Sequence, residues 1–96
     1  METSIALLHP AGKKAIRMDG QKYEQLQKGI LNVLSKKINL THTEMLHEIK
    51  EYFSTSKPSF VGSVEWHMEW VKLDLEARGV IKRESRNGKF IFSLVR

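Results

Sequence analysis

Cysteine is absent from this 96-residue sequence. Its absence excludes disulfide bonds, cysteine ligands for zinc and a thiol nucleophile, and it fits a reducing compartment. Long apolar runs are also missing, because none approaches the roughly 20 residues that span a bilayer. The short run from Ile5 to Leu8 follows no basic segment and is too brief for a signal peptide. We therefore expect a soluble, cytoplasmic protein.

Recognisable motifs for catalysis or cofactor binding are missing as well. The glycines at expected turns are isolated from one another and form no phosphate-binding loop. The spacing of His42 and His47 does not place them on one helical face, so a zinc site is not expected. Ser63, His67 and Asp74 fall in one predicted helix, where a helix cap and an exposed charge pattern explain them better than a catalytic triad. We expect a non-enzymatic protein with no cofactor and no metal.

The composition that remains is typical of one small globular domain, with 41% hydrophobic and 28% charged residues. Apolar residues recur at helical spacing in segments 21–37, 42–53 and 64–78. Asp19, a capping box formed by Thr41 and Glu44, and Ser63 are the expected starts of these three helices. The predicted buried faces are Tyr23, Leu26, Ile30, Val33 and Leu34; Met45, Leu46, Ile49, Tyr52 and Phe53; and Val64, Met68, Val71 and Leu75.

A β-hairpin is expected after the third helix, which ends at Gly79. Asn87-Gly88 separates two β-rich segments and favours a two-residue turn, which pairs Arg86 with Lys89 and Arg83 with Phe92. Paired residues share a face of a hairpin. The core side should therefore carry Ile81, Phe90, Phe92 and Leu94, and the solvent side Lys82, Glu84, Arg86, Lys89 and Ser93.

Three helices, an extended link at 38–40 and a terminal hairpin form the element order of a winged helix-turn-helix. The predicted fold class is mainly α with a small antiparallel β-hairpin, comprising a winged-helix domain over residues 19–96 and an extended N-terminal arm over residues 1–18. Within the arm, a turn at 9–12 separates short extended segments.

The run VGSVEWHMEWVKLDLEARGVIKR at 61–83, with KYEQLQKGIL before it, resembles a family of small, functionally uncharacterised bacterial winged-helix-like proteins. The likeness extends from His9 to about Arg83. It implies the winged-helix fold, and it implies no activity, because the family has no established one.

The positive charge is distributed unevenly. The chain has a formal net charge of +5, which favours a polyanionic partner. Acidic residues nevertheless outnumber basic ones in the second and third predicted helices, whereas lysine and arginine are in excess in the arm and the hairpin. A recognition helix normally presents Arg, Lys, Asn or Gln to base edges. We therefore do not expect the third helix to read the major groove.

The third helix also carries a second apolar stripe, formed by Trp66, Trp70, Leu73 and Ala77, opposite its core face. In one interpretation the arm folds over the stripe and completes the core. In the other the stripe contacts another chain, most simply a second copy across a two-fold axis. The two are compatible, because the arm of one subunit could cover the helix of the other.

Two functions remain open. The first is a DNA-associated, regulatory protein whose phosphate contacts are Lys82, Arg86 and Lys89 of the wing and Lys13, Lys14 and Arg17 of the arm. The second is a protein-interaction or homodimerisation module that uses Trp66, Trp70 and Leu73 and does not bind DNA. Cations on an exposed strand edge also have a plainer explanation, since they prevent edge-to-edge aggregation. We place DNA association slightly ahead, and expect a homodimer in either case.

Overall fold

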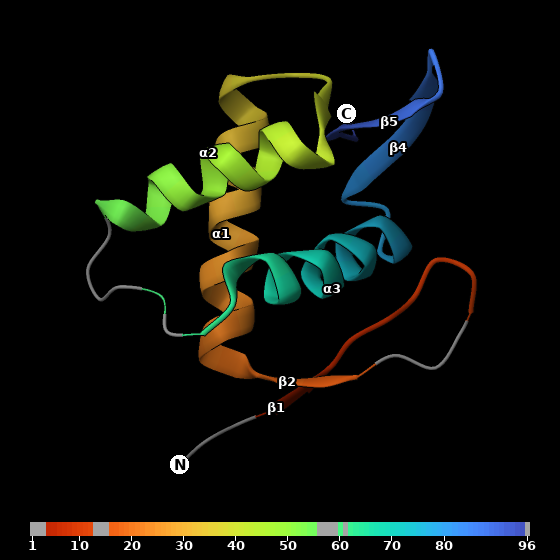
Figure 1. Cartoon of the computed structure of the whole chain (residues 1–96). Helices are drawn as coiled ribbons and strands as arrows, with labels where there is room; N and C mark the ends of the chain where they lie inside the picture. The colour runs from red at the N-terminus through yellow and green to blue at the C-terminus, as the bar shows by residue number, and fades with distance from the viewer. Residues whose placement is uncertain (1–3, 13–15, 56–59, 61, 96) are drawn as a thin grey trace.

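The computed structural model describes residues 4–12, 16–55, 60 and 62–95. Three helices and two small antiparallel sheets make up these residues, which confirms the predicted coarse fold class (Figure 1). In chain order the elements are β1 (Ser4–Ala6), β2 (Arg17–Asp19), α1 (Gly20–Lys36), β3 (Leu40–Thr41), α2 (His42–Ser54), α3 (Val64–Ala77), β4 (Ile81–Arg86) and β5 (Lys89–Leu94).

Each helix begins at the residue that the sequence predicts. The Asp19 carboxylate accepts a hydrogen bond from the Lys22 amide at the start of α1. Thr41 and Glu44 form both hydrogen bonds of the capping box before α2, and the Ser63 hydroxyl accepts from the Trp66 amide before α3. These side chains satisfy backbone N–H groups that the first helical turn leaves without partners.

The core lies where the three helices meet, with α2 and α3 both packed across α1 (Figure 1). The predicted apolar faces are confirmed, because Leu26, Ile30 and Leu34 of α1 and Met68 and Leu75 of α3 are fully buried. Leu46, Tyr52 and Val64 are only partly buried at the edge of the same cluster.

The predicted hairpin register is also confirmed, and a third strand joins the sheet. Arg86 pairs with Lys89 and Arg83 with Phe92. Asn87 and Gly88 have φ angles of 50° and 77°, as the two central residues of a type I′ turn require. The predicted extended link supplies β3, which pairs with β5 and gives the strand order β3-β5-β4.

One prediction about the hairpin is wrong. Phe90, expected in the core, is 53% exposed, whereas Ile91 on the other side of the strand is buried. Phe92, on the same face of the strand as Phe90, is buried. Phe90 lies nearer the turn, beyond the last β3–β5 pair, Thr41 with Ile91. Position along the hairpin therefore decides burial here as well as alternation.

The N-terminal arm packs on the core of its own chain. β1 and β2 pair antiparallel, and the Leu7 amide donates to the Ile16 carbonyl at 3.0 Å. Leu7 and Met18 are buried in the main cluster. Leu8 differs from the prediction of an apolar cover, because its side chain is 45% exposed.

Asp74 is the buried polar centre that ties this arm to two helices. Although the sequence places it in an exposed charge pattern, it has no exposed surface. Its carboxylate accepts hydrogen bonds from the Leu8 amide at 2.8 Å, from the Tyr23 hydroxyl and from the Arg78 Nε at 2.9 Å. The correction follows from tertiary contacts, since two of these donors are more than 50 residues away in sequence.

Candidate functional site

The three predicted interface residues lie on α3 but differ in exposure. Trp66 is 49% exposed, whereas Trp70 is partly buried against the core. Their rings meet edge to face with centroids 6.4 Å apart. Leu73 is partly buried and lines a groove beside the helix. The apolar stripe is therefore covered in part, and its Trp66 end remains open to a partner.

A groove of about 780 Å³ runs between α3, the start of α2 and the β4–β5 hairpin. Its lining residues are Thr41, His42, Thr43 and Glu44 from the β3–α2 region, Glu69, Lys72, Leu73 and Glu76 from α3, and Arg83, Lys89, Phe90 and Phe92 from the hairpin. The lining carries both signs of charge around an apolar strip. We call its two sides the α3 wall and the hairpin wall.

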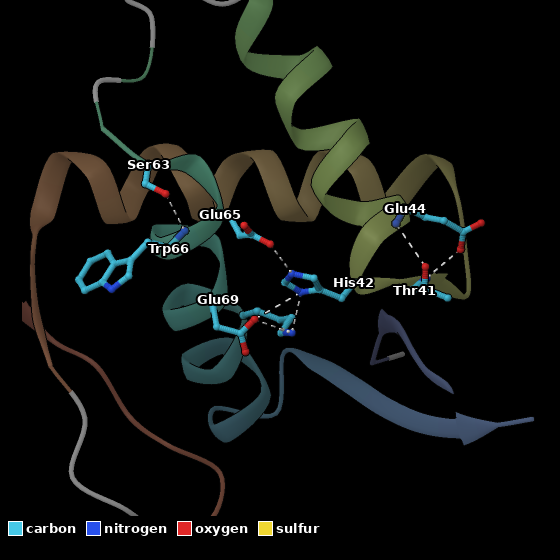
Figure 2. A network of polar contacts seen from close by, with 8 residues as sticks. Thr41, His42, Glu44, Ser63, Glu65, Trp66 and Glu69 are labelled. Atoms are coloured by element: carbon cyan, nitrogen blue, oxygen red, sulfur yellow. Dashed lines mark hydrogen bonds and ion pairs between the residues drawn. The ribbon is translucent and has the colours of Figure 1, made fainter. Parts of the chain in front are cut away.

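A polar network centred on His42, one of the groove-lining residues, joins the start of α2 to α3 (Figure 2). His42 Nε2 lies 3.5 Å from Glu65 Oε2, and its Nδ1 lies 3.4 Å from Glu69 Oε2. Lys72 Nζ is 3.1 Å from the same Nδ1. An ammonium group can only donate, so Nδ1 accepts in this contact and Nε2 is left to carry the proton toward Glu65.

Lys72 is a member of this network that the sequence analysis did not single out. Only 6% of the residue is exposed, and its ammonium lies 4.5 Å from the centre of the Phe92 ring. Contacts with Glu69, His42 and an aromatic face offset the cost of burying the charge. Lys72 follows Met68 by four residues, at the edge of the core face of the helix, and this spacing could have predicted its burial.

The hairpin wall is built on an arginine that contacts both sides. Arg83 Nε lies 3.1 Å from Glu76 Oε1 on α3. Its guanidinium also lies over the Phe90 ring, 4.6 Å from the centroid. The exposed phenylalanine is thus held against a charged side chain at the rim of the groove.

The predicted phosphate contacts do not form one continuous cationic surface. Lys82 and Arg86 both approach Glu84, at 3.3 Å and 3.6 Å. Lys89 has no carboxylate within ion-pair distance among the residues that the structure describes. Arg17 belongs to the arm, where it donates to the Ser4 hydroxyl at 3.0 Å. Lys13 and Lys14 lie outside the described residues.

α3 separates the basic hairpin from the arm (Figure 1). The hairpin contacts the side of α3 that carries Glu76, whereas the arm contacts the side that carries Asp74.

The described part of the chain contains neither a metal-binding cluster nor a membrane-spanning helix. No group of three or more His, Asp or Glu side chains is arranged there to hold a metal ion. Within the same residues, no helix has the length and apolar character needed to cross a membrane.

Comparison with known families gives one match. The model of a family of unknown function, DUF6958, matches residues 4–90. The chain belongs to the DUF6958 family. The match covers most of the arm, all three helices and most of the hairpin, so the α3 stripe and every groove-lining residue except Phe92 lie within the DUF6958 region. Comparisons with curated proteins and with solved structures give no match. The description of DUF6958 names no activity, and function must be argued from the surface itself.

Proposed function

We propose that this DUF6958 protein is a non-enzymatic winged-helix module that binds protein through α3 and the adjoining groove. The observation that carries the proposal is the composition of the outer side of α3, where an exposed tryptophan, Trp66, lies next to two partly exposed carboxylates, Glu65 and Glu69. The cytoplasmic location expected from the sequence remains part of the proposal.

The topology supports the winged-helix part of this proposal. After the arm, the order is helix, short strand, helix, helix and hairpin. The short strand between α1 and α2 pairs with the last strand, which places it beside the hairpin. In a winged helix the third helix is the one that a ligand meets first, so the composition of α3 bears directly on what the module binds.

The charge of α3 argues against a polyanion as that ligand. Glu65 keeps 64% of its side chain exposed, and Glu69 keeps 46%. Bringing such carboxylates against phosphates costs free energy through repulsion and lost hydration. The one α3 lysine in the groove, Lys72, is buried and already contacts Glu69.

Exposed aromatic side chains favour a protein ligand instead. Trp66 and Phe90 are about half exposed. Tryptophan is enriched among the residues that contribute most to binding at protein interfaces. Partly desolvated carboxylates around an apolar strip provide the polar rim that such an interface needs.

Site-specific photo-crosslinking in cells tests this proposal. A benzophenone amino acid at position 66 should form a covalent adduct with a protein, identified by mass spectrometry and bound again in purified form. The same amino acid at position 24, on the exposed surface of α1, is the matched control and should give no adduct. Phe90→Glu should abolish the adduct at position 66. Equal labelling from both positions, or adducts with nucleic acid alone, would refute the proposal.

DNA association is the second candidate, and the tip of the hairpin favours it. Arg86 and Lys89 flank the Asn87-Gly88 turn, and 59% of the Arg86 side chain is exposed. Cations at such a tip can lie along a phosphate backbone without any base contact.

A salt-dependent titration on mixed-sequence duplex DNA tests the second candidate. Each phosphate contact should contribute about −0.9 to the slope of log affinity against log salt. The Arg86→Ala/Lys89→Ala variant should therefore bind more weakly with a shallower slope. Undetectable binding at low salt, or binding that the variant leaves unchanged, would exclude this candidate.

A further inference from the structure

Resting on the proposed function, we infer that the partner in the groove is a second copy of this chain. Each copy would place the basic tip of its hairpin on the acidic α3 wall of the other. The proposed homodimer is isologous. In it, Lys89 and Arg86 of one protomer face Glu65 and Glu69 of the other.

The two walls of the groove carry complementary charge at their exposed ends. Glu65 is largely exposed, and among the described residues the polar side chain recorded against its carboxylate is the His42 imidazole, 3.5 Å away. Lys89 lines the opposite wall and has no ion pair within the described chain, and Arg86 lies directly across the hairpin from it. An exposed carboxylate therefore remains beside the groove at Glu65, and a cation without an ion pair in the described chain remains on the hairpin wall at Lys89.

Two-fold symmetry brings these opposite charges together. In an isologous interface the same patch is used on both subunits, so each contact occurs twice. A two-fold axis that runs along the groove, in the plane of the interface, places the α3 wall of each copy over the hairpin wall of the other. Both walls then meet their complement, which a single flat charged patch could not achieve.

The centre of such an interface is apolar. Leu73 and Phe90 line the groove from its two walls, and Trp66 lies on α3 outside the groove lining with about half its surface exposed. Mutual burial of these side chains from two copies would contribute most of the binding free energy, while the charged ends fix the orientation.

Charge reversal with complementation provides the test, with sedimentation velocity on the full chain as the measurement. The wild type should be dimeric at micromolar concentration. Glu65→Lys and Lys89→Glu should each raise the dimer dissociation constant about tenfold or more, because attraction becomes repulsion at two symmetric contacts. An equimolar mixture of the two variants should regain dimer, since the heterodimer restores opposite charges at both contacts. Glu24→Lys, which reverses an exposed charge on α1, is the matched control and should leave the dimer unchanged.

A second variant separates loss of the interface from loss of the fold. Phe90→Ser removes an exposed side chain, so the thermal midpoint should stay close to that of the wild type while the dimer dissociates. A monomeric wild type at high micromolar concentration, or variants that fail to complement, would overturn the inference.

The outcomes also distinguish this inference from the proposed function. If the chain is monomeric and position 66 still crosslinks to a different protein, the homodimer is refuted and the protein-binding function stands. If position 66 yields no protein adduct and the chain is monomeric, both are refuted.

Discussion

The carboxylate of Asp74 is a single buried group on which three distant segments depend. The arm contributes a backbone amide, α1 contributes the Tyr23 hydroxyl, and α3 contributes Arg78. Arg78 remains partly exposed, so its guanidinium neutralises the buried charge from the surface. Contact with Asp74 raises the pKa of Arg78 further.

Tyr23→Phe should lower the free energy of unfolding by about 1–3 kcal/mol, because it leaves a buried carboxylate short of one donor. Urea unfolding at neutral pH measures the change. Because Phe retains the ring that packs in the core, a loss near zero would mean that the Tyr23 hydroxyl contributes nothing to stability.

The same tyrosine predicts a loss of stability at high pH. Burial, reinforced by the hydrogen bond to Asp74, raises the pKa of Tyr23 from 10.0 to about 12. The unfolded chain thus loses the phenolic proton before the folded chain does. The stabilisation of the fold by the protonated Tyr23 hydroxyl is complete below pH 10.0 and is lost as the pH rises toward about 12. Relative to the wild type, Tyr23→Phe should show a shallower decline of stability across this interval, and parallel curves would contradict this assignment.

At the residue scale, the sequence predicts local interactions well and tertiary ones poorly. Asp19, Thr41 and Ser63 act on backbone groups within three residues, so a short motif identifies them. Asp74 and Lys72 look like surface charges in the sequence. Their burial depends on the arm, on α1 and on the hairpin, which no local pattern around them describes.

The start of α2 is an element whose stability depends on one cap. Thr41→Ala removes the hydroxyl that accepts from the Glu44 amide, and should lower the free energy of unfolding by about 1 kcal/mol. Thr43→Ala is the matched control, because Thr43 is exposed in the first turn of the same helix but does not cap it. Equal losses in the two variants would show that the cap does not stabilise the helix.

Glu44 completes that cap and gives it a pH dependence. Its hydrogen bond from the Thr41 backbone lowers the pKa of Glu44 below the usual 4.5. Stabilisation by the carboxylate is present above pH 4.5 and is lost as the pH falls through the lowered folded pKa. Glu44→Gln should remove this part of the acid dependence in thermal unfolding, whereas an unchanged acid profile would assign it to other groups.

The contact between α1 and α2 depends on a glycine. A Cβ at Gly29 would lie 3.3 Å from side-chain atoms of both Ile49 and Tyr52. Gly29→Val should therefore cost about 1–3 kcal/mol through overpacking. Lys28→Val, at the exposed neighbouring position, controls for the lower helix propensity of valine. A smaller loss of unfolding free energy for Gly29→Val than for Lys28→Val would contradict close packing between α1 and α2 at Gly29.

At the scale of elements, helix spans and hairpin register follow from periodicity and from the Asn87-Gly88 turn. The error at Phe90 shows where such reasoning ends. Alternation assigns residues to one face of the hairpin or the other. It does not predict how far along the hairpin that face is buried, and Phe90 lies beyond the last pair with β3.

For the whole molecule, the distribution of charge matters more than its sum. The chain is basic overall, but exposed carboxylates lie on the outer side of α3. The sequence identified α3 as acidic and aromatic, and both properties persist on the folded surface. It could not predict the groove, because the groove depends on how the hairpin, α2 and α3 pack together.

The central claim is that the outer side of α3 binds protein and does not dock onto nucleic acid. Its most direct test is a heteronuclear NMR titration of the full chain with mixed-sequence duplex DNA at low salt. The Trp66 indole resonance and the amide resonances of Glu65 and Glu69 should stay in place, with any shifts confined to the tip around Arg86 and Lys89. Progressive shifts of Trp66, Glu65 and Glu69 with added duplex would contradict it.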